Sequence, residues 1–394
     1  MDEIKFAFAL PTRIVFGAGA IQSLAGEALS LGGRRIMLVC DPGIVAAGLS
    51  DRVISILTEA GVQVKLFSSI SPNPRDAECS AGVAAAGALC ADVLVGLGGG
   101  SAMDAAKAIG VLLANGGTVQ DWADARQPIS KPPIPLICIP TTAGTGSEVT
   151  PVAVITDTKE KLKIALLGHH VAPSLALLDP ELTLGLPADI TASTGMDALT
   201  HAIEAYTCRL ANPISDALAL AAIEKIGVHL PSACKYENNE KAREQMLLGS
   251  LLAGIAFGQA DVGAVHCLAE SLGGRYDIPH GVANALFLPH VMAFNAKSET
   301  ERHARIGRVL NRKLTAASDE TAARESVHAI CRIKDEIGLP SMKAVIHLAD
   351  AELQLLAALA ADHPCSASNA RPINAEVYFR LLSDANEDMP PISP

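Results

Sequence analysis

The chain has 394 residues, of which 49% are hydrophobic and 19% are charged, and its formal net charge is −11. This composition can fill a large aliphatic core and excludes a disordered chain. The sequence contains no dense run of Lys and Arg. It therefore excludes a nucleic-acid-binding surface, which needs clustered basic residues to neutralise phosphates.

The cysteines and the N-terminal stretch predict the compartment. The nine cysteines are scattered and form no C-x-x-C motif, so neither a disulfide scaffold nor a cysteine zinc site is expected. This usage indicates a reducing compartment. The opening MDEIKFAFALPTRI contains only a very short apolar stretch and does not resemble a signal peptide. Asp, Gly or Pro interrupts each long apolar run, so no membrane span is expected. We expect a cytoplasmic protein without a membrane partner.

Hydrophobic patterning divides the chain near residue 188. Before it, strands are expected at 34–40 and 62–69, at 92–101 running into a glycine turn, and at 133–148 opening into a polar loop. Helices are expected at 53–61, 81–91 and 103–115. These strands are continuous apolar runs, which is typical of a parallel sheet covered by helices on both faces. After residue 189 the strand signals disappear and the spacing is helical. The sequence predicts an α/β domain at residues 1–188 and an all-helical domain at residues 189–394.

Two polar loops follow strands of the predicted sheet. In VLVGLGGGSAMDAAKA (93–108) a strand leads through glycines into a helix, whose first N–H groups would face an anion. This run is neither G-x-G-x-x-G nor a P-loop, and a turn that needs glycine only for steric reasons is the alternative. The second loop, PTTAGTGSE (140–148), offers several hydroxyls. Because ligands bind beyond the carboxyl ends of parallel strands, the two loops together predict a dinucleotide site.

Asp41 ends the strand at 34–40 and is placed to accept hydrogen bonds from a ribose diol. Its carboxylate would repel a 2′-phosphate, which favours NAD over NADP. A turn aspartate before Pro42 and Gly43 is the alternative interpretation.

The stretch GMDALTHAIEAY (195–206) predicts a helix that carries polar residues on one face. Residues i and i+4 of a helix stack, so Asp197 and His201 point the same way, and Glu204 continues their stripe. A solvated polar stripe is the alternative to a ligand helix.

Two further histidines follow about 65 residues later. His266 lies inside a predicted helix, and Pro279 places His280 at the start of the next one. We expect Gly273 and Gly274 to end the first helix, so that the two histidines converge. Three imidazoles with one carboxylate suit a divalent first-row metal, either iron or zinc.

Over essentially its full length the sequence resembles the iron-containing (group III) alcohol dehydrogenase family. The matching stretches occur in the family's order: GGGSAMDAAKA, IPTTAGTGSEVT, LLDPELT, TGMDALTHAIEAY, GAVHCLAESLGG, YDIPHGVANA and NARPINAEVYFRLL. The resemblance implies the dehydroquinate synthase-like architecture of this family. It consists of a dinucleotide-binding α/β domain and a helical metal-binding domain, with the active site in the cleft between them.

The resemblance also implies the residues of the site. The metal ligands would be Asp197, His201, His266 and His280, with Fe(II) expected and Zn(II) as the alternative. The cofactor NAD would contact Asp41, Asn73, Gly99, Gly100, Ser101, Asp104, Thr141, Thr142, Thr145, Thr150 and Lys163. A homodimer or a higher homo-oligomer is expected.

Two positions depart from the family pattern. Glu270 stands where the family usually has a further histidine, one turn after His266, and Asp261 stands where small or uncharged residues are usual. Both acids have a structural interpretation, as hydrogen-bonded or ion-paired carboxylates. If both face the active site, they would discourage anionic substrates and favour cationic or polyhydroxy ones. Glu270 or a ribose hydroxyl would carry the proton that leaves the alcohol.

We therefore predict a metal-dependent, NAD(H)-linked alcohol dehydrogenase that interconverts a small alcohol and its aldehyde or ketone. The alternatives on the same fold are glycerol dehydrogenase-like and maleylacetate reductase-like activities. A metal hydrolase would leave the two cofactor loops unused, and the chain has no H-E-x-x-H motif.

Overall fold

The computed structural model describes residues 5–391, so the first four residues of the N-terminal stretch lie outside it. The chain forms two compact units. One contains residues 10–184, and the other contains residues 185–391 together with residues 5–9. Each unit is described by itself.

The first unit is built on a six-stranded parallel sheet with the order β1-β8-β5-β4-β2-β3. Its strands are β1 (Arg13–Phe16), β2 (Arg35–Val39), β3 (Gln63–Phe67), β4 (Val93–Gly98), β5 (Leu136–Pro140) and β8 (Leu175–Leu178). The chain runs outward from β2 to β3 and then returns to the other side of β2 with β4. The order therefore reverses between β2 and β4, which is where open parallel sheets bind ligands.

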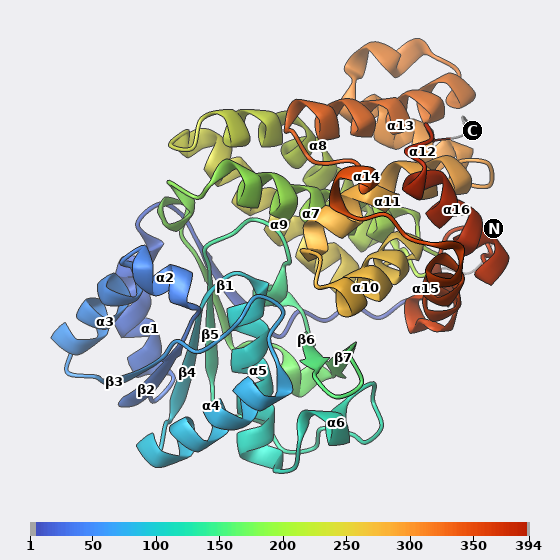
Figure 1. Ribbon diagram of the computed structural model, residues 1–394. Helices are drawn as coiled ribbons and strands as arrows, with labels where there is room; N and C mark the ends of the chain where they lie inside the picture. Colours follow the sequence, from blue (N-terminus) through green and yellow to red (C-terminus); the bar gives the residue numbers. More distant parts are fainter. Residues whose placement is uncertain (1–4, 392–394) are drawn as a thin grey trace. The chain divides into compact units, whose positions relative to one another are not determined.

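Side chains that alternate along the strands fill two separate cores. Met37 and Val39 of β2 face one core, and Ile36 and Leu38 face the other. Helices cover both faces, with α4 and α5 on one side and α1 and α3 on the other (Figure 1). Burial on both faces explains why these strands are continuous apolar runs.

The helical elements of this unit are η1 (Ala20–Ser23), α1 (Leu24–Ser30), α2 (Pro42–Ala46), α3 (Leu49–Glu59), α4 (Asp76–Leu89), α5 (Gly100–Asn115), α6 (Val119–Trp122), η2 (Ser147–Val149), η3 (His169–Val171) and η4 (Pro180–Thr183). An antiparallel hairpin of β6 (Val152–Asp157) and β7 (Leu162–Leu167) stands apart from the main sheet. The sequence analysis did not predict this hairpin.

The regular elements of the second unit are all helices within its described residues, as predicted. Its elements are α7 (Ala188–Thr207), α8 (Pro213–Lys235), α9 (Glu240–Gln259), α10 (Ala264–Tyr276), α11 (His280–Asn295), α12 (Thr300–Leu310), η5 (Arg312–Ala316), α13 (Asp319–Glu336), α14 (Met342–Val345), α15 (Asp350–Asp362), η6 (Pro364–Ser368) and α16 (Ala375–Asn386). In Figure 1, α7 lies among α8, α9, α10 and α11. The predicted fold class is confirmed.

Helix α8 is long and apolar enough to cross a bilayer, and α9 with α10 would pass the same test together despite a bend of 101°. However, α8 packs against both α7 and α9. Packed core helices pass this test by composition alone, so it is weak evidence for a membrane span.

Several predicted boundaries were wrong. Helix α5 begins at Gly100 and not at 103, because the glycine turn itself supplies the first helical residues. Helix α4 begins at Asp76 and not at 81. Gly273 and Gly274 do not end α10, which continues to Tyr276 and stops at Asp277 in the left-handed conformation. Glycine lowers helix propensity by only about 1 kcal/mol, which tertiary packing outweighs.

A close approach between α11 and α7 brings together the helices that carry Asp197 and His280. A Cβ added to Gly281 would lie 2.0 Å from the carbonyl oxygen of Ser193 and 3.3 Å from Cβ of Asp197. Only glycine lets the start of α11 lie this close to the backbone of α7. His280 and Asp197 are brought together by this contact.

Gly281→Ala is expected to destabilise the helical unit by about 1–3 kcal/mol, because the backbone of α7 or α11 must move to admit the methyl group. Urea unfolding followed by circular dichroism measures this change. Gly87→Ala is the control, since Gly87 is an exposed helical residue with open space around it and should gain up to about 1 kcal/mol. Equal unfolding midpoints for Gly281→Ala and the wild type would contradict the close-packing argument.

Candidate active site

Four side chains expected to bind a metal lie together in the helical unit. Asp197 and His201 project from α7, His266 projects from α10, and His280 is the first residue of α11. One ligand atom of each lies within 4.8 Å of the others. Asp197 Oδ1 is 3.7 Å from His201 Nδ1 and 3.6 Å from His280 Nε2. An aspartate and three imidazoles at this spacing fit a divalent metal such as iron or zinc.

Three of the four side chains of the cluster are buried, and the fourth, His280, is partly exposed. The side chains of Asp197, His201 and His266 are at most 7% exposed, whereas that of His280 is 24% exposed. His201 stacks on Phe257 at 4.3 Å, and burial lowers its pKa to about 4. Its Nδ1 is buried and makes no hydrogen bond. A neutral imidazole with an unused buried nitrogen is what a metal ligand requires.

Asp197 is held as a carboxylate. Burial opposes its ionisation, but the three histidines and Asn284 outweigh burial and lower its pKa. Asn284 Nδ2 donates to Asp197 Oδ1 at 2.7 Å. The same nitrogen lies 3.4 Å from His266 Nε2 and 3.3 Å from His280 Nε2.

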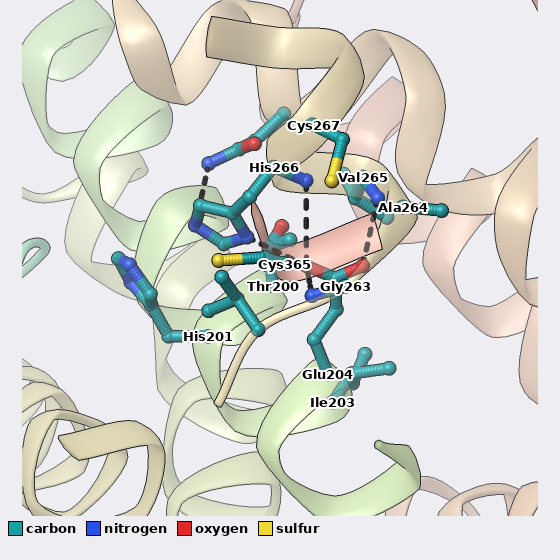
Figure 2. A network of polar contacts seen from close by, with 12 residues as sticks. Thr200, His201, Ile203, Glu204, Gly263, Ala264, Val265, His266, Cys267 and Cys365 are labelled. Atoms are coloured by element: carbon teal, nitrogen blue, oxygen red, sulfur yellow. Dashed lines mark hydrogen bonds and ion pairs between the residues drawn. The ribbon is translucent and has the colours of Figure 1, made fainter. Parts of the chain in front are cut away.

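Glu204 fixes the orientation of His266 (Figure 2). His266 Nδ1 lies 2.6 Å from Glu204 Oε2, and the same carboxylate accepts the backbone N–H groups of Gly263 and Val265 at 2.9 and 2.8 Å. A carboxylate that takes the Nδ1 hydrogen leaves Nε2 with its lone pair directed at the cluster. The sequence analysis placed Glu204 on the correct helix stripe but gave it no role. Its spacing from His201 was the available signal.

Glu270 and Asp261, the two acids that differ from the family pattern, each have a hydrogen-bond partner. Glu270 Oε2 lies 2.9 Å from His363 Nε2, and the hydroxyl of Ser368 donates to Asp261. The side chains of Glu270 and His363 are about one fifth exposed. His363 was not among the expected site residues. It lies 93 residues from Glu270, and no local pattern marks it.

The α/β unit brings Asp41 beside the glycine turn. Asp41 follows β2 and caps α2 by accepting the N–H groups of Gly43 and Ile44 through Oδ1. Its Oδ2 lies 3.2 Å from the position that a Cβ of Gly98 would occupy. Since Gly98 ends β4, Asp41 lies at the switch point of the sheet.

The loop at residues 140–148, here called the threonine loop, packs directly on the glycine turn. Thr141 donates its backbone N–H to Gly98 O at 3.0 Å. A Cβ on Gly99 would lie 3.4 Å from Thr142 Oγ1, and one on Gly100 would lie 2.6 Å from Thr145. The structure thus brings together the two loops that the sequence marked, next to Ser101 in the first turn of α5. The N-terminus of this 16-residue helix suits a phosphate.

Asp104 and Lys107 connect α5 to the threonine loop and to the segment that follows it. Asp104 accepts hydrogen bonds from the hydroxyl of Ser147 at 2.6 Å and the N–H of Val154 at 3.0 Å. Lys107 Nζ donates to the carbonyl oxygens of Thr150 at 3.0 Å and of Val152 at 2.6 Å. Burial raises the pKa of Asp104 and lowers that of Lys107, while their mutual attraction opposes both shifts. Asp104 and Thr150 are therefore engaged within the protein, and the sequence analysis missed Lys107.

The two remaining expected cofactor contacts lie on neighbouring segments. Asn73 has φ 57° in the loop between β3 and α4, and the next residue, Pro74, accepts the N–H of Thr156 at 2.8 Å. Lys163 lies on β7 opposite Thr156, and its charge acts on Asp104. The loop of Asn73 is thereby held against the hairpin.

Glu148 is a buried acid in the threonine loop. It is 1% exposed, its Oε1 makes no hydrogen bond, and burial raises its pKa to about 7. The charge of Lys107 opposes this shift. The sequence analysis did not single out this residue.

Comparison with known proteins supports the interpretation of both units. Residues 11–180 match the family described as iron-containing alcohol dehydrogenase, and residues 191–386 match the C-terminal domain of that family. The chain is 37% identical over 378 residues to the NAD-dependent methanol dehydrogenase of Bacillus methanolicus, covering 96% of this chain and 99% of that protein.

Solved structures show the same architecture. A 1,3-propanediol oxidoreductase superposes with a TM-score of 0.93 at 37% identity, covering 97% of this chain and 100% of that one. Sulfoacetaldehyde reductase from Bifidobacterium kashiwanohense, solved with NAD+, gives 0.88 at 30% identity and covers 98% and 99% of the two chains.

The fold and the relatives define an oxidoreductase that acts on alcohols. The chain belongs to the iron-containing alcohol dehydrogenase family. The family resemblance and the enzyme class expected from the sequence are confirmed.

The raised pKa of Glu148 predicts a pH-dependent stability. The unfolded chain ionises this acid near pH 4.5 and the folded chain near pH 7, so its contribution is fully present below pH 4.5 and is lost as the pH rises to 7. Glu148→Gln should match the wild type at pH 4.5 and exceed its stability at pH 8, by up to about 3 kcal/mol. Thermal unfolding at both pH values measures the difference.

Glu160→Gln removes an equal charge from an exposed side chain of the same unit and should shift stability by less than about 0.5 kcal/mol at either pH. A Glu148→Gln variant whose gain does not depend on pH would show that burial does not penalise this carboxylate.

Proposed function

We propose that the protein is a metal-dependent, NAD(H)-linked alcohol dehydrogenase that interconverts a small alcohol and its aldehyde or ketone. The convergence of Asp197, His201, His266 and His280 on one point carries this proposal. No other group of His, Cys, Asp and Glu side chains in the described residues lies close enough together to hold a metal ion by the same criterion.

The four residues would hold one divalent metal, Fe(II) by the family resemblance, with Zn(II) as the alternative. When bound, such a metal supplies a Lewis acid that favours the ionised form of a coordinated hydroxyl. Ligand chemistry suits both ions, because Asp and His bind either. The NAD+ complex of a related reductase supports NAD as the hydride acceptor.

The residues around the cluster orient it and restrict water. Glu204 holds His266 in one tautomer, Asn284 orients Asp197, and Phe257 covers one face of His201. The exposed edge of His280 leaves an approach for the substrate. The proton of the alcohol would pass to Glu270 or to a ribose hydroxyl of the cofactor.

Cofactor binding is assigned to the residues that meet at the switch point of the sheet. The N–H groups at the start of α5, around Gly99, Gly100 and Ser101, would face the pyrophosphate. Asp41 Oδ2 would accept the ribose hydroxyls and repel a 2′-phosphate, which favours NAD. Asp104 would act indirectly, because its carboxylate holds the threonine loop against α5.

The further contacts with NAD would come from Asn73, Thr141, Thr142, Thr145, Thr150 and Lys163. A cytoplasmic location is consistent with nine cysteines that are all free. By the family resemblance, the assembly would be a homodimer or a higher homo-oligomer.

The proposed function is tested by NADH formation with short alcohols, followed by absorbance. Fe(II)-loaded and Zn(II)-loaded protein should turn over, and a chelated sample should lose turnover until metal is restored. Titrating NAD into the chelated sample measures NAD binding and distinguishes a dehydrogenase, which should bind NAD, from a metal hydrolase, which should not. Turnover that survives complete chelation would rule out the metal-dependent reaction.

Glu204→Gln is expected to weaken metal binding roughly 10- to 100-fold, because the amide no longer fixes His266 in the metal-binding tautomer. Competition between the protein and a chelator measures the affinity without any need for turnover. Glu244→Gln removes a carboxylate from an exposed position on α9 and should leave the affinity unchanged. Equal metal affinities for Glu204→Gln and the wild type would show that Glu204 does not support metal binding.

A further inference from the structure

Glu270 and His363 form a hydrogen-bonded pair beside the four-ligand cluster. Glu270 lies one helical turn after His266 on α10, and residues four apart on a helix share one face with Cβ atoms about 5–6 Å apart. The carboxylate acts electrostatically on both His201 and His266. It is therefore close to any substrate whose hydroxyl lies at the cluster.

His363 restricts the carboxylate to one orientation. Its Nε2 is 2.9 Å from Glu270 Oε2. The backbone N–H of Cys365 donates to His363 Nδ1, so the ring hydrogen lies on Nε2, which donates it to Glu270. His363 itself precedes η6, with Nδ1 3.2 Å from the backbone nitrogen of Cys365 and 3.5 Å from Cys267 Sγ.

An ionised carboxylate only accepts hydrogen bonds. Glu270 is also about one fifth exposed, so small molecules can reach it. A carboxylate held in one orientation next to the reacting site favours a substrate that carries a donor group at the matching position. An alkyl group there would desolvate the carboxylate without replacing the lost hydrogen bond.

We infer that Glu270 is a specificity-determining residue. It accepts a hydrogen bond from a second donor group, hydroxyl or ammonium, on the alcohol substrate, and His363 is the residue that positions it. This inference rests on the proposed alcohol dehydrogenase function and adds the substrate class. It also assigns Glu270 to recognition and leaves proton transfer to a ribose hydroxyl.

The test uses three primary alcohols of equal size that differ only in the group at the far end of a three-carbon chain. This group is methyl in n-butanol, hydroxyl in 1,3-propanediol and ammonium in 3-amino-1-propanol. The specificity constant kcat/KM is measured for each alcohol with metal-loaded protein and NAD, and each donor-bearing alcohol is expressed as a ratio to n-butanol. Glu270→Leu should lower both ratios roughly tenfold, as expected for loss of one hydrogen bond to a charged group. Glu270→Gln keeps a neutral acceptor, so it should lower the ammonium ratio more than the hydroxyl ratio.

Two further variants separate recognition from fold effects. Glu244→Gln, on the exposed side of α9, should leave both ratios unchanged. His363→Asn should lower both ratios less than Glu270→Leu does, chiefly through KM, because it frees the carboxylate to rotate without removing it. A merely structural role of His363 would reduce the rates of all three alcohols alike.

Ligand-observed NMR of the same three alcohols bound to metal-loaded protein gives a readout that needs no turnover. The donor-bearing alcohols should bind the wild type more tightly than n-butanol does, and Glu270→Leu should abolish the difference. Ratios that do not change in Glu270→Leu, with turnover retained, would overturn the inference and leave the proposed function intact. An equal loss of kcat on all three alcohols would assign Glu270 to proton transfer instead. Absence of turnover in every metal form would overturn the proposed function, and the NMR comparison would then decide the role of Glu270.

Discussion

The buried carboxylate of Glu204 is the constraint on which the helical unit depends. At 4% exposure it has lost its hydration, and such a group is tolerated only when hydrogen bonds replace the lost water. The N–H groups at the start of α10 and the ring of His266 supply them. One side chain of α7 thereby fixes both where α10 begins and which nitrogen of His266 faces the cluster.

The same helix also meets α11 through the close contact at Gly281. The starts of two helices therefore pack against α7 near Asp197 and His201. Hydrogen bonds to Glu204 hold α10, and the close contact at Gly281 together with the hydrogen bond from Asn284 to Asp197 holds α11. The four side chains and their hydrogen-bond partners Glu204 and Asn284 all belong to α7, α10 and α11, and Phe257 of α9 packs on His201. Such mutual support is what a preorganised metal centre would require.

In the α/β unit, a charged pair of the buried Lys107 and the partly buried Asp104 makes comparable hydrogen bonds. Asp104 and Lys107 lie within one turn of α5 and reach Ser147, Thr150, Val152 and Val154. Removing charges from water costs several kcal/mol per ion, which hydrogen bonds and the opposite charge must offset. The hydrogen bonds of both side chains tie the segment after β5 to the helix whose N-terminus is assigned to the pyrophosphate.

Local patterns determined much of this protein. Continuous apolar strands identified the parallel sheet, and i, i+4 spacing placed Asp197 and His201 on one face. The hairpin at 152–167 was missed because only alternate residues of its strands are buried, so it lacks the continuous apolar run of the main sheet. The start of α5 and the end of α10 were also misplaced, since packing outweighs the weak preferences of glycine. Helix α4 begins earlier than predicted because Glu78 accepts the backbone N–H of Arg75 at its start.

Only the tertiary structure decided the pairings between distant residues. Nothing local in the sequence connects Glu270 with His363, Glu204 with Gly263, or Gly281 with Ser193, because each pair is joined by the path of the helices and not by spacing along one of them. The sequence specified which chemical groups the protein has and on which helix faces they lie. The fold decided which of them are buried together, and burial is what gives a carboxylate or an imidazole its protonation state and its partner.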